Sequence, residues 1–215
     1  VLVTVNDGTT TAAELNTING MTTALVTATA VATVSGSVSD LTTLVGNEGT
    51  SGDKVDLKAD VAITVTDTGS VAATDIATIN GVTTGLVTAT NIGTVTGTSS
   101  ALNTLAGNEG TSGDKVNLKT DVLVTVNDGT TTAAQLNTFN TATSSLVNAT
   151  AVTAISGSVS DLTTLVGNEG TSGDKVDLKA DVAITVSDTG SVAAADLTTI
   201  NGVTTGLVTA TNAST

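Results

Sequence analysis

The residues of this chain best suited to binding chemistry lie in a ten-residue motif, GNEGTSGDKV, which occurs at residues 46–55, 107–116 and 167–176. Each copy supplies side-chain oxygen atoms on a backbone that its glycines make flexible, and calcium prefers hard oxygen ligands of this kind. Calcium is therefore the one cofactor that the sequence suggests. Its candidate ligands are Asn47, Glu48, Asp53, Asn108, Glu109, Asp114, Asn168, Glu169 and Asp174.

A second interpretation of the motif needs no metal. The order of residues matches neither an EF-hand loop nor the glycine-rich nonapeptide of calcium-binding β-rolls. The motif also fits a solvated loop, in which Lys54 offsets the charge of Asp53. The sequence is compatible with both interpretations.

A second acidic set follows short runs of β-branched residues. Its members are Asp7, Asp67, Asp128 and Asp188. In a stack of coils these carboxylates would form a column along one edge, with cations bound between them. Aspartate close before glycine also forms turns without any cation, so the sequence leaves two explanations for this set.

The composition argues against catalysis. The chain has no His and no Cys, so the usual pairs of nucleophile and base are not available. The candidate carboxylates all recur in several copies, which is typical of a scaffold. We therefore expect the protein not to be an enzyme.

The charge of the chain excludes further classes of partner. Six basic residues stand against 20 acidic ones, a net charge of −14. Nucleic acid is excluded as a partner because phosphate neutralisation needs basic clusters. No apolar run reaches the roughly 18 residues of a membrane span, so we expect no membrane insertion.

Short strands and helices must position these residues. Val3-Thr4-Val5, Thr33-Val34 and Ile63-Thr64-Val65 alternate as half-buried strands do. We expect the strands to end at turns such as Asn6-Asp7-Gly8, where the backbone turns left-handed. Second strands are expected at residues 54–58 and 86–90.

Between these strands, leucine or isoleucine pairs three residues apart predict short amphipathic helices. The inward pairs are Leu41 and Leu44, Ile76 and Ile79, Leu102 and Leu105, and Leu162 and Leu165. Ser70 and Ser191 are the residues expected to cap two of these helices at their N-termini.

The chain repeats itself every 121 residues, because residues 1–60 return at 122–181 with 50 of 60 positions identical. A finer period of about 30 residues divides it into alternating short and long units. We divide the chain into pairs of units at 1–60, 61–121, 122–181 and 182–215. The predicted fold is a β-rich solenoid whose coils contain short parallel strands and one short helix or turn; the alternative is a string of small β-rich domains.

The phrase VTDTGSVAATDIATINGVTTGLVTAT, at residues 65–90 and nearly unchanged at 186–211, carries a family resemblance. It resembles the Thr/Ala-rich tandem repeats of large secreted and cell-surface proteins of cyanobacteria, which are grouped loosely with hemolysin-type calcium-binding proteins. The resemblance implies an extracellular or cell-surface location and a structural, matrix or adhesive role. It carries no calcium sites over, because the calcium-roll motif is absent.

We expect a non-enzymatic extracellular structural protein that forms a filament, a surface layer or an adhesin stalk. Exposed strand edges at the two ends of a stack predict head-to-tail self-association. The alternative is a binding module: a calcium-dependent adhesin that recognises a glycan or cell-surface ligand, or a phage fibre that recognises a host.

Overall fold

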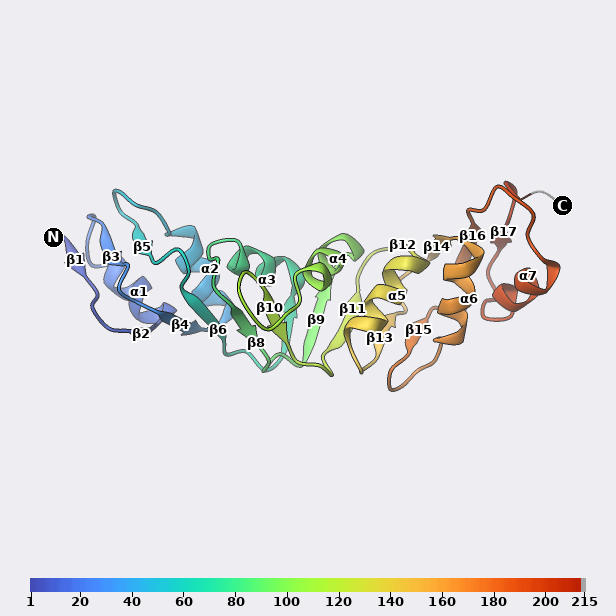
Figure 1. Ribbon diagram of the computed structural model, residues 1–215, viewed down its shortest axis with the longest axis horizontal. Coiled ribbons are helices and arrows are strands. Elements are labelled where there is room, and N and C mark those ends of the chain that lie inside the picture. Colours follow the sequence, from blue (N-terminus) through green and yellow to red (C-terminus); the bar gives the residue numbers. More distant parts are fainter. Residues whose placement is uncertain (214–215) are drawn as a thin grey trace. The chain divides into compact units, whose positions relative to one another are not determined.

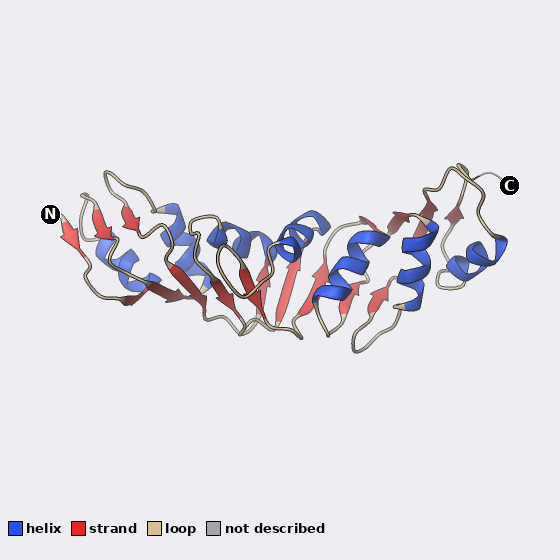
Figure 2. Ribbon diagram, in the orientation of Figure 1, coloured by secondary structure: helices blue, strands red, loops and turns tan. Residues whose placement is uncertain are grey.

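The computed structural model describes residues 1–213, and it is an α/β fold with several parallel sheets built from repeating β-α units. Figure 2 shows short strands and short helices alternating along the chain, and Figure 1 labels them. Every registered strand pair is parallel. Parallel strands and one short helix in each unit were predicted from the sequence, and both are confirmed.

The helices are α1 (Ala12–Asn19), α2 (Val38–Gly46), α3 (Ala73–Asn80), α4 (Ser99–Gly107), α5 (Ala133–Ala142), α6 (Val159–Gly167) and α7 (Ala194–Asn201). The strands of the first half are β1 (Val3–Thr4), β2 (Thr9–Thr11), β3 (Val26–Ala28), β4 (Thr33–Gly36), β5 (Val55–Leu57), β6 (Ala62–Val65), β7 (Ser70–Ala72) and β8 (Val87–Ala89). Those of the second half are β9 (Thr94–Gly97), β10 (Val116–Leu118), β11 (Leu123–Val126), β12 (Thr130–Thr132), β13 (Val147–Ala149), β14 (Ala154–Gly157), β15 (Val176–Leu178), β16 (Ala183–Val186) and β17 (Val208–Thr209).

The chain forms two compact units. The first comprises Val1–Gly93 and Gly107–Lys119, and the second comprises Thr94–Ala106 and Thr120–Thr215. The first unit contains a sheet in the order β1-β3-β5 and a sheet in the order β10-β8-β6-β4-β2. In the second unit, β15, β13, β11 and β9 lie side by side, and β12, β14, β16 and β17 form another sheet.

Strand ladders in each unit cross boundaries between sequence repeats. In the first unit, β6 pairs with β4 of the preceding repeat, with Val34 opposite Ile63, and also with β8 of its own repeat. In the second unit, β16 pairs in the same way with β14, with Ile155 opposite Ile184, and with β17. The hydrogen-bonded ladder therefore holds neighbouring repeats together as well as the strands within one repeat.

The core is a thin layer of aliphatic side chains from these strands and helices. Val26, Val55 and Val87 are fully buried on strands β3, β5 and β8. The predicted inward pairs of the helices are confirmed, since Leu41 and Leu44 are 1% and 2% exposed and the other three pairs are equally buried. Because β-branched and leucine side chains fill this layer, the fold needs almost no aromatic residue.

Two details of the sequence prediction are wrong. Ser70 lies in strand β7, and the N-caps of α3 and α7 are Ala72 and Ala193, which make no side-chain hydrogen bond there. The prediction also missed the strands β2, β7 and β12, which come directly before a helix. Because the chain stays extended for these three residues, the helix begins later than a serine cap would place it.

The turns also differ from the expectation. Among the residues that the structure describes, positive φ angles occur only at Gly52, Gly113 and Gly173, with φ of 76°, 65° and 71°. Gly8 and Gly69 therefore do not adopt the left-handed backbone that was expected after Asp7 and Asp67. The left-handed residue belongs instead to the GNEGTSGDKV loops. None of the helices within residues 1–213 has the length and apolar character needed to cross a membrane.

Candidate functional site

Each GNEGTSGDKV loop connects the end of a helix to the next strand. In the first copy, Asn47 is the C-cap of α2, and its carbonyl oxygen accepts a hydrogen bond of 2.8 Å from the backbone nitrogen of Val55. Glu48 forms a parallel bridge with Val55. The other two copies repeat both contacts. The backbone groups of Asn47 and Glu48 therefore form the contacts that close the loop.

The lysine of each loop stabilises the helix that precedes it. The ammonium nitrogen of Lys54 donates to the carbonyl oxygen of Gly46 at 2.8 Å, and Lys115 and Lys175 make the same contact at 3.1 and 3.0 Å. A cation is favourable here because the carbonyl groups at a helix C-terminus carry partial negative charge. The sequence interpretation paired the charge of Lys54 with Asp53. In the structure this charge lies at the C-terminal end of α2.

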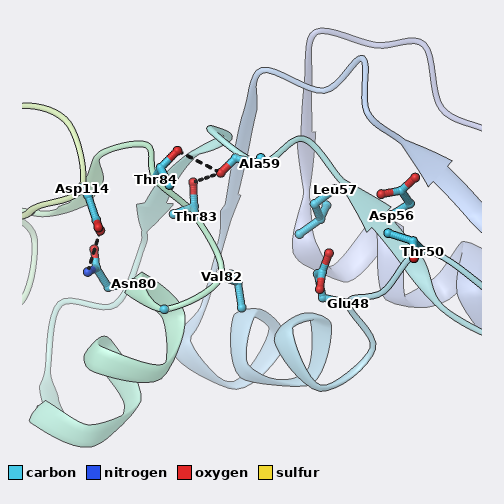
Figure 3. A pocket seen from close by; sticks show the side chains of 11 residues that line it. Glu48, Thr50, Asp56, Leu57, Ala59, Asn80, Val82, Thr83, Thr84 and Asp114 are labelled. Atoms are coloured by element: carbon cyan, nitrogen blue, oxygen red, sulfur yellow. Dashed lines mark hydrogen bonds between the residues drawn. The ribbon is translucent and has the colours of Figure 1, made fainter.

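The candidate calcium ligands come together only in part. Glu48 and Asp114, from successive loops, both line a cavity of about 540 Å³ together with Asp56 and Asn80. Figure 3 shows Asp114 and Asn80 on one side and Glu48 and Asp56 on the other. Neither Asn47 nor Asp53 lines this cavity. Within residues 1–213, no three acidic side chains form a group that could hold a metal ion.

Asparagines, which sequence reasoning missed, link neighbouring coils within each compact unit. Asn80 is 8% exposed and donates from its amide nitrogen to Asp114 at 3.3 Å (Figure 3). Asn16 and Asn137 each donate to a backbone carbonyl of the following helix, at Asp40 and Asp161, over 2.9 Å. The signal that could have found them is an asparagine at the same helical position in residues 12–19 and 133–140.

The second acidic set has a partner that neither sequence interpretation included. The carboxylate of Asp67 accepts a hydrogen bond of 2.7 Å from the backbone nitrogen of Val38, the first residue of α2. Asp128 accepts one from Ser99 of α4 at 2.5 Å, and Asp188 accepts one from Val159 of α6 at 2.7 Å. The first backbone N–H groups of a helix lack partners within it and carry partial positive charge. A carboxylate placed there satisfies one of these groups and interacts favourably with the helix dipole.

The residue before each of these aspartates strengthens the same contact. The backbone nitrogens of Thr66, Asn127 and Ser187 donate to the carbonyl oxygens of Gly36, Gly97 and Gly157, each at 2.9 Å. A main-chain bond and a carboxylate thus hold each of three alternate coils against the one before. Asp7 is the exception, because it is exposed and has no hydrogen-bonding partner within residues 1–213.

Three other carboxyl groups have perturbed acidity. The backbone N–H of Thr11, followed by the hydroxyls of Thr11 and Thr10, lowers the pKa of Glu14 below its ordinary value. A hydrogen bond from Lys58 lowers the pKa of Asp60, and one from Lys179 lowers that of Asp181. All three groups lie at the surface, where such interactions are weak. They are local stabilising contacts of the repeat.

Comparison with known proteins adds no family. No family model matches the chain, and searches of curated proteins and of solved structures give no significant match. The site that recurs in this structure is the junction between coils, where an aspartate binds the N-terminus of a helix. Its chemistry is the recognition of a backbone N–H by a carboxylate.

Proposed function

We propose that this protein is a non-enzymatic structural repeat protein whose coils stack as a solenoid, and that it serves outside the cell as a filament, surface layer or adhesin stalk. The observation that carries the proposal is the strand ladder that crosses a repeat boundary at β4–β6 and again at β14–β16. In separate domains joined by linkers, strands would pair only with strands of the same repeat. Shared ladders support a continuous stack instead.

The side-chain contacts at the junctions support the same proposal. Asp67 and Asp188 use one carboxylate oxygen each to hold the helix of the preceding coil, at the same distance of 2.7 Å. Since a contact repeated at fixed spacing stabilises each new coil against its neighbour, length grows without any new kind of interface. The acidic surface, with a net charge of −14, keeps such a body soluble.

Small-angle X-ray scattering on the purified chain tests the stack. A solenoid gives the scattering of a stiff rod of constant cross-section, and its particle length stays the same as salt is varied. A chain of separate domains gives the broad distance distribution of a flexible string, which would contradict the proposal. Immunogold labelling of intact producing cells tests the location, and label confined to the cell interior would contradict the extracellular role.

A further inference from the structure

The charged side chains that line the cavity of about 540 Å³ are all acidic. They are Glu48, Asp56 and Asp114. The lysines close to them in the sequence bind other groups, namely Gly46 for Lys54, Asp60 for Lys58 and Gly107 for Lys115. A hollow lined by charges of one sign raises the local concentration of ligands of the opposite sign. The cavity therefore favours a cationic ligand.

The hydroxyl groups of the lining also present acceptors. Thr83 and Thr84 donate to the carbonyl oxygen of Ala59 at 3.4 and 3.3 Å (Figure 3), and Thr83 also donates to that of Val61 at 2.5 Å. A hydroxyl group has a single hydrogen. Since that hydrogen is already engaged, each of these two oxygens can only accept a hydrogen bond from a ligand. Such a lining suits an ammonium group, which donates hydrogen bonds and accepts none.

Asn80 provides a separate sign of a donor ligand. Its side chain is 8% exposed, and its oxygen Oδ1 has no hydrogen-bonding partner within residues 1–213. Its nitrogen Nδ2 donates to the carboxylate of Asp114. Half a turn about the Cβ–Cγ bond exchanges these two atoms, and this torsion is broad and roughly two-fold. Oδ1 and the carboxylate then face one another, an arrangement that is favourable only with a donor or a cation between them.

The acidic groups are too widely separated for a single metal ion. Figure 3 shows Asp114 with Asn80 on one side of the cavity and Glu48 with Asp56 on the other. No three acidic side chains within residues 1–213 form a group that could hold a metal ion. A small cation bound on one side would leave the carboxylates of the other side without a partner. Two cationic groups joined by a spacer satisfy both sides.

We propose that this cavity binds a linear diamine. One ammonium group binds between Asp114 and Asn80, and the other binds at Glu48 and Asp56. The methylene chain between them lies against the apolar side chain of Leu57, which also lines the cavity. The inference does not depend on the proposed stack or on its location, because every lining residue belongs to the first compact unit.

Calorimetric titration of the 215-residue chain with putrescine, a short linear diamine, tests the proposal. Butylamine is the matched ligand, because it has the same carbon chain and only one ammonium group. We expect putrescine to bind about tenfold or more tightly than butylamine, since one charge-assisted hydrogen-bonded contact is worth at least that factor. Calcium and magnesium, which carry the same charge as putrescine on a single atom, should bind more weakly at equal ionic strength.

Substitutions locate the site. Glu48→Gln and Asp114→Asn, which remove a carboxylate on either side, should each weaken putrescine binding by about tenfold. The matched control is Asp53→Asn, which removes the same charge from an exposed position of the loop outside the cavity. It should leave the affinity for putrescine nearly unchanged. The denaturation midpoint of each variant shows whether its fold is intact.

Asp56→Asn gives a variant whose fold the repeat itself supports. Asn117 holds the same position in β10, opposite Thr88, as Asp56 holds in β5 opposite Thr27. This variant should also bind putrescine more weakly than the unmodified chain. Three results would overturn the inference: no saturable binding at millimolar putrescine, equal effects of Asp53→Asn and Asp56→Asn, or tighter binding of calcium than of putrescine.

Discussion

The carboxylate of Asp188 lies 2.7 Å from the backbone nitrogen of Val159, and these two residues are 29 positions apart in the sequence. Asp67 and Val38 repeat this relationship at the same separation in the first compact unit. A helix N-cap is usually supplied by a residue next to the helix. Helix α6 has a cap from a neighbouring residue and a second one from a distant residue. The hydroxyl of Ser158 accepts a hydrogen bond from the backbone nitrogen of Asp161, and the carboxylate of Asp188 accepts one from the backbone nitrogen of Val159. The fold thus uses a helix end as a contact between coils.

Removing this contact should destabilise the fold locally. For Asp188→Ala we expect a loss of about 1 kcal/mol, because caps of this type contribute about 0.5–2 kcal/mol. Chemical denaturation measures the loss, and hydrogen exchange at the amide of Val159 locates it. Asp7→Ala is the matched control and should change nothing in the 215-residue chain. Equal effects of the two substitutions would contradict a specific role for the junction.

The helix core is tested by a leucine that the sequence picked out. Leu102 is 4% exposed in α4, and its counterparts Leu41 and Leu162 are each 1% exposed. Leu102→Ala should lower the free energy of unfolding by about 2–5 kcal/mol, as deletion of a buried leucine does. Thr104→Ala, at an exposed position of the same helix, should change it little. If Leu102→Ala and Thr104→Ala change the free energy of unfolding equally little, the alignment of the coils with one another is wrong.

Glu14 should give the chain a measurable dependence on pH. Its pKa lies below the ordinary 4.5, chiefly because of the hydrogen bond from the backbone of Thr11. A carboxyl group whose pKa is lower in the folded state stabilises the fold above its unfolded pKa, and this contribution is lost as the pH falls through the folded pKa. The stabilisation from Glu14 should therefore be present at neutral pH and disappear as the pH falls below 4.5.

The repeat supplies the variant that tests this dependence. Gln135 occupies the position of Glu14 and accepts the same hydrogen bond from the backbone of Thr132 at 3.1 Å. Glu14→Gln should keep the helix cap but remove the loss of stability that Glu14 causes at acidic pH. Gln135→Glu should add an equal loss of stability at acidic pH. Urea denaturation midpoints on both sides of pH 4.5 measure the difference. Parallel curves for all three proteins would refute this role of Glu14.

Calcium is tested by the stability of the folded chain. We expect the melting temperature in millimolar calcium to match that in magnesium at equal ionic strength, because Lys54 and the backbone of Asn47 already occupy the loop. Binding at one hundred times the dissociation constant would add about 2.7 kcal/mol per site. A rise specific to calcium, abolished by Glu48→Gln or Asp114→Asn, would instead support the metal interpretation.

Local patterns of the sequence determined the elements and the core. Alternation along the strands located β6, β8 and β5, and leucine or isoleucine pairs three apart located α2, α3, α4 and α6 with their buried faces. These features depend on neighbours within a few residues, since a strand has period 2 and a helix 3.6. The repeats followed from direct comparison of the sequence with itself. Asp67 and Asp114 were also picked out as candidate site residues, though for a different chemistry.

Only the tertiary structure decided how these elements meet. The sequence treated Val3-Thr4-Val5 and Thr33-Val34 as equivalent strands, yet β1 belongs to the sheet with β3 and β4 to the sheet with β2. The hydrogen bond from Val38 to Asp67 and the position of Lys54 on Gly46 were likewise decided at this level. The physical reason is that strand partners and helix caps depend on how one coil is offset against the next. That offset is set by packing between residues some 29 positions apart, which local periodicity does not encode.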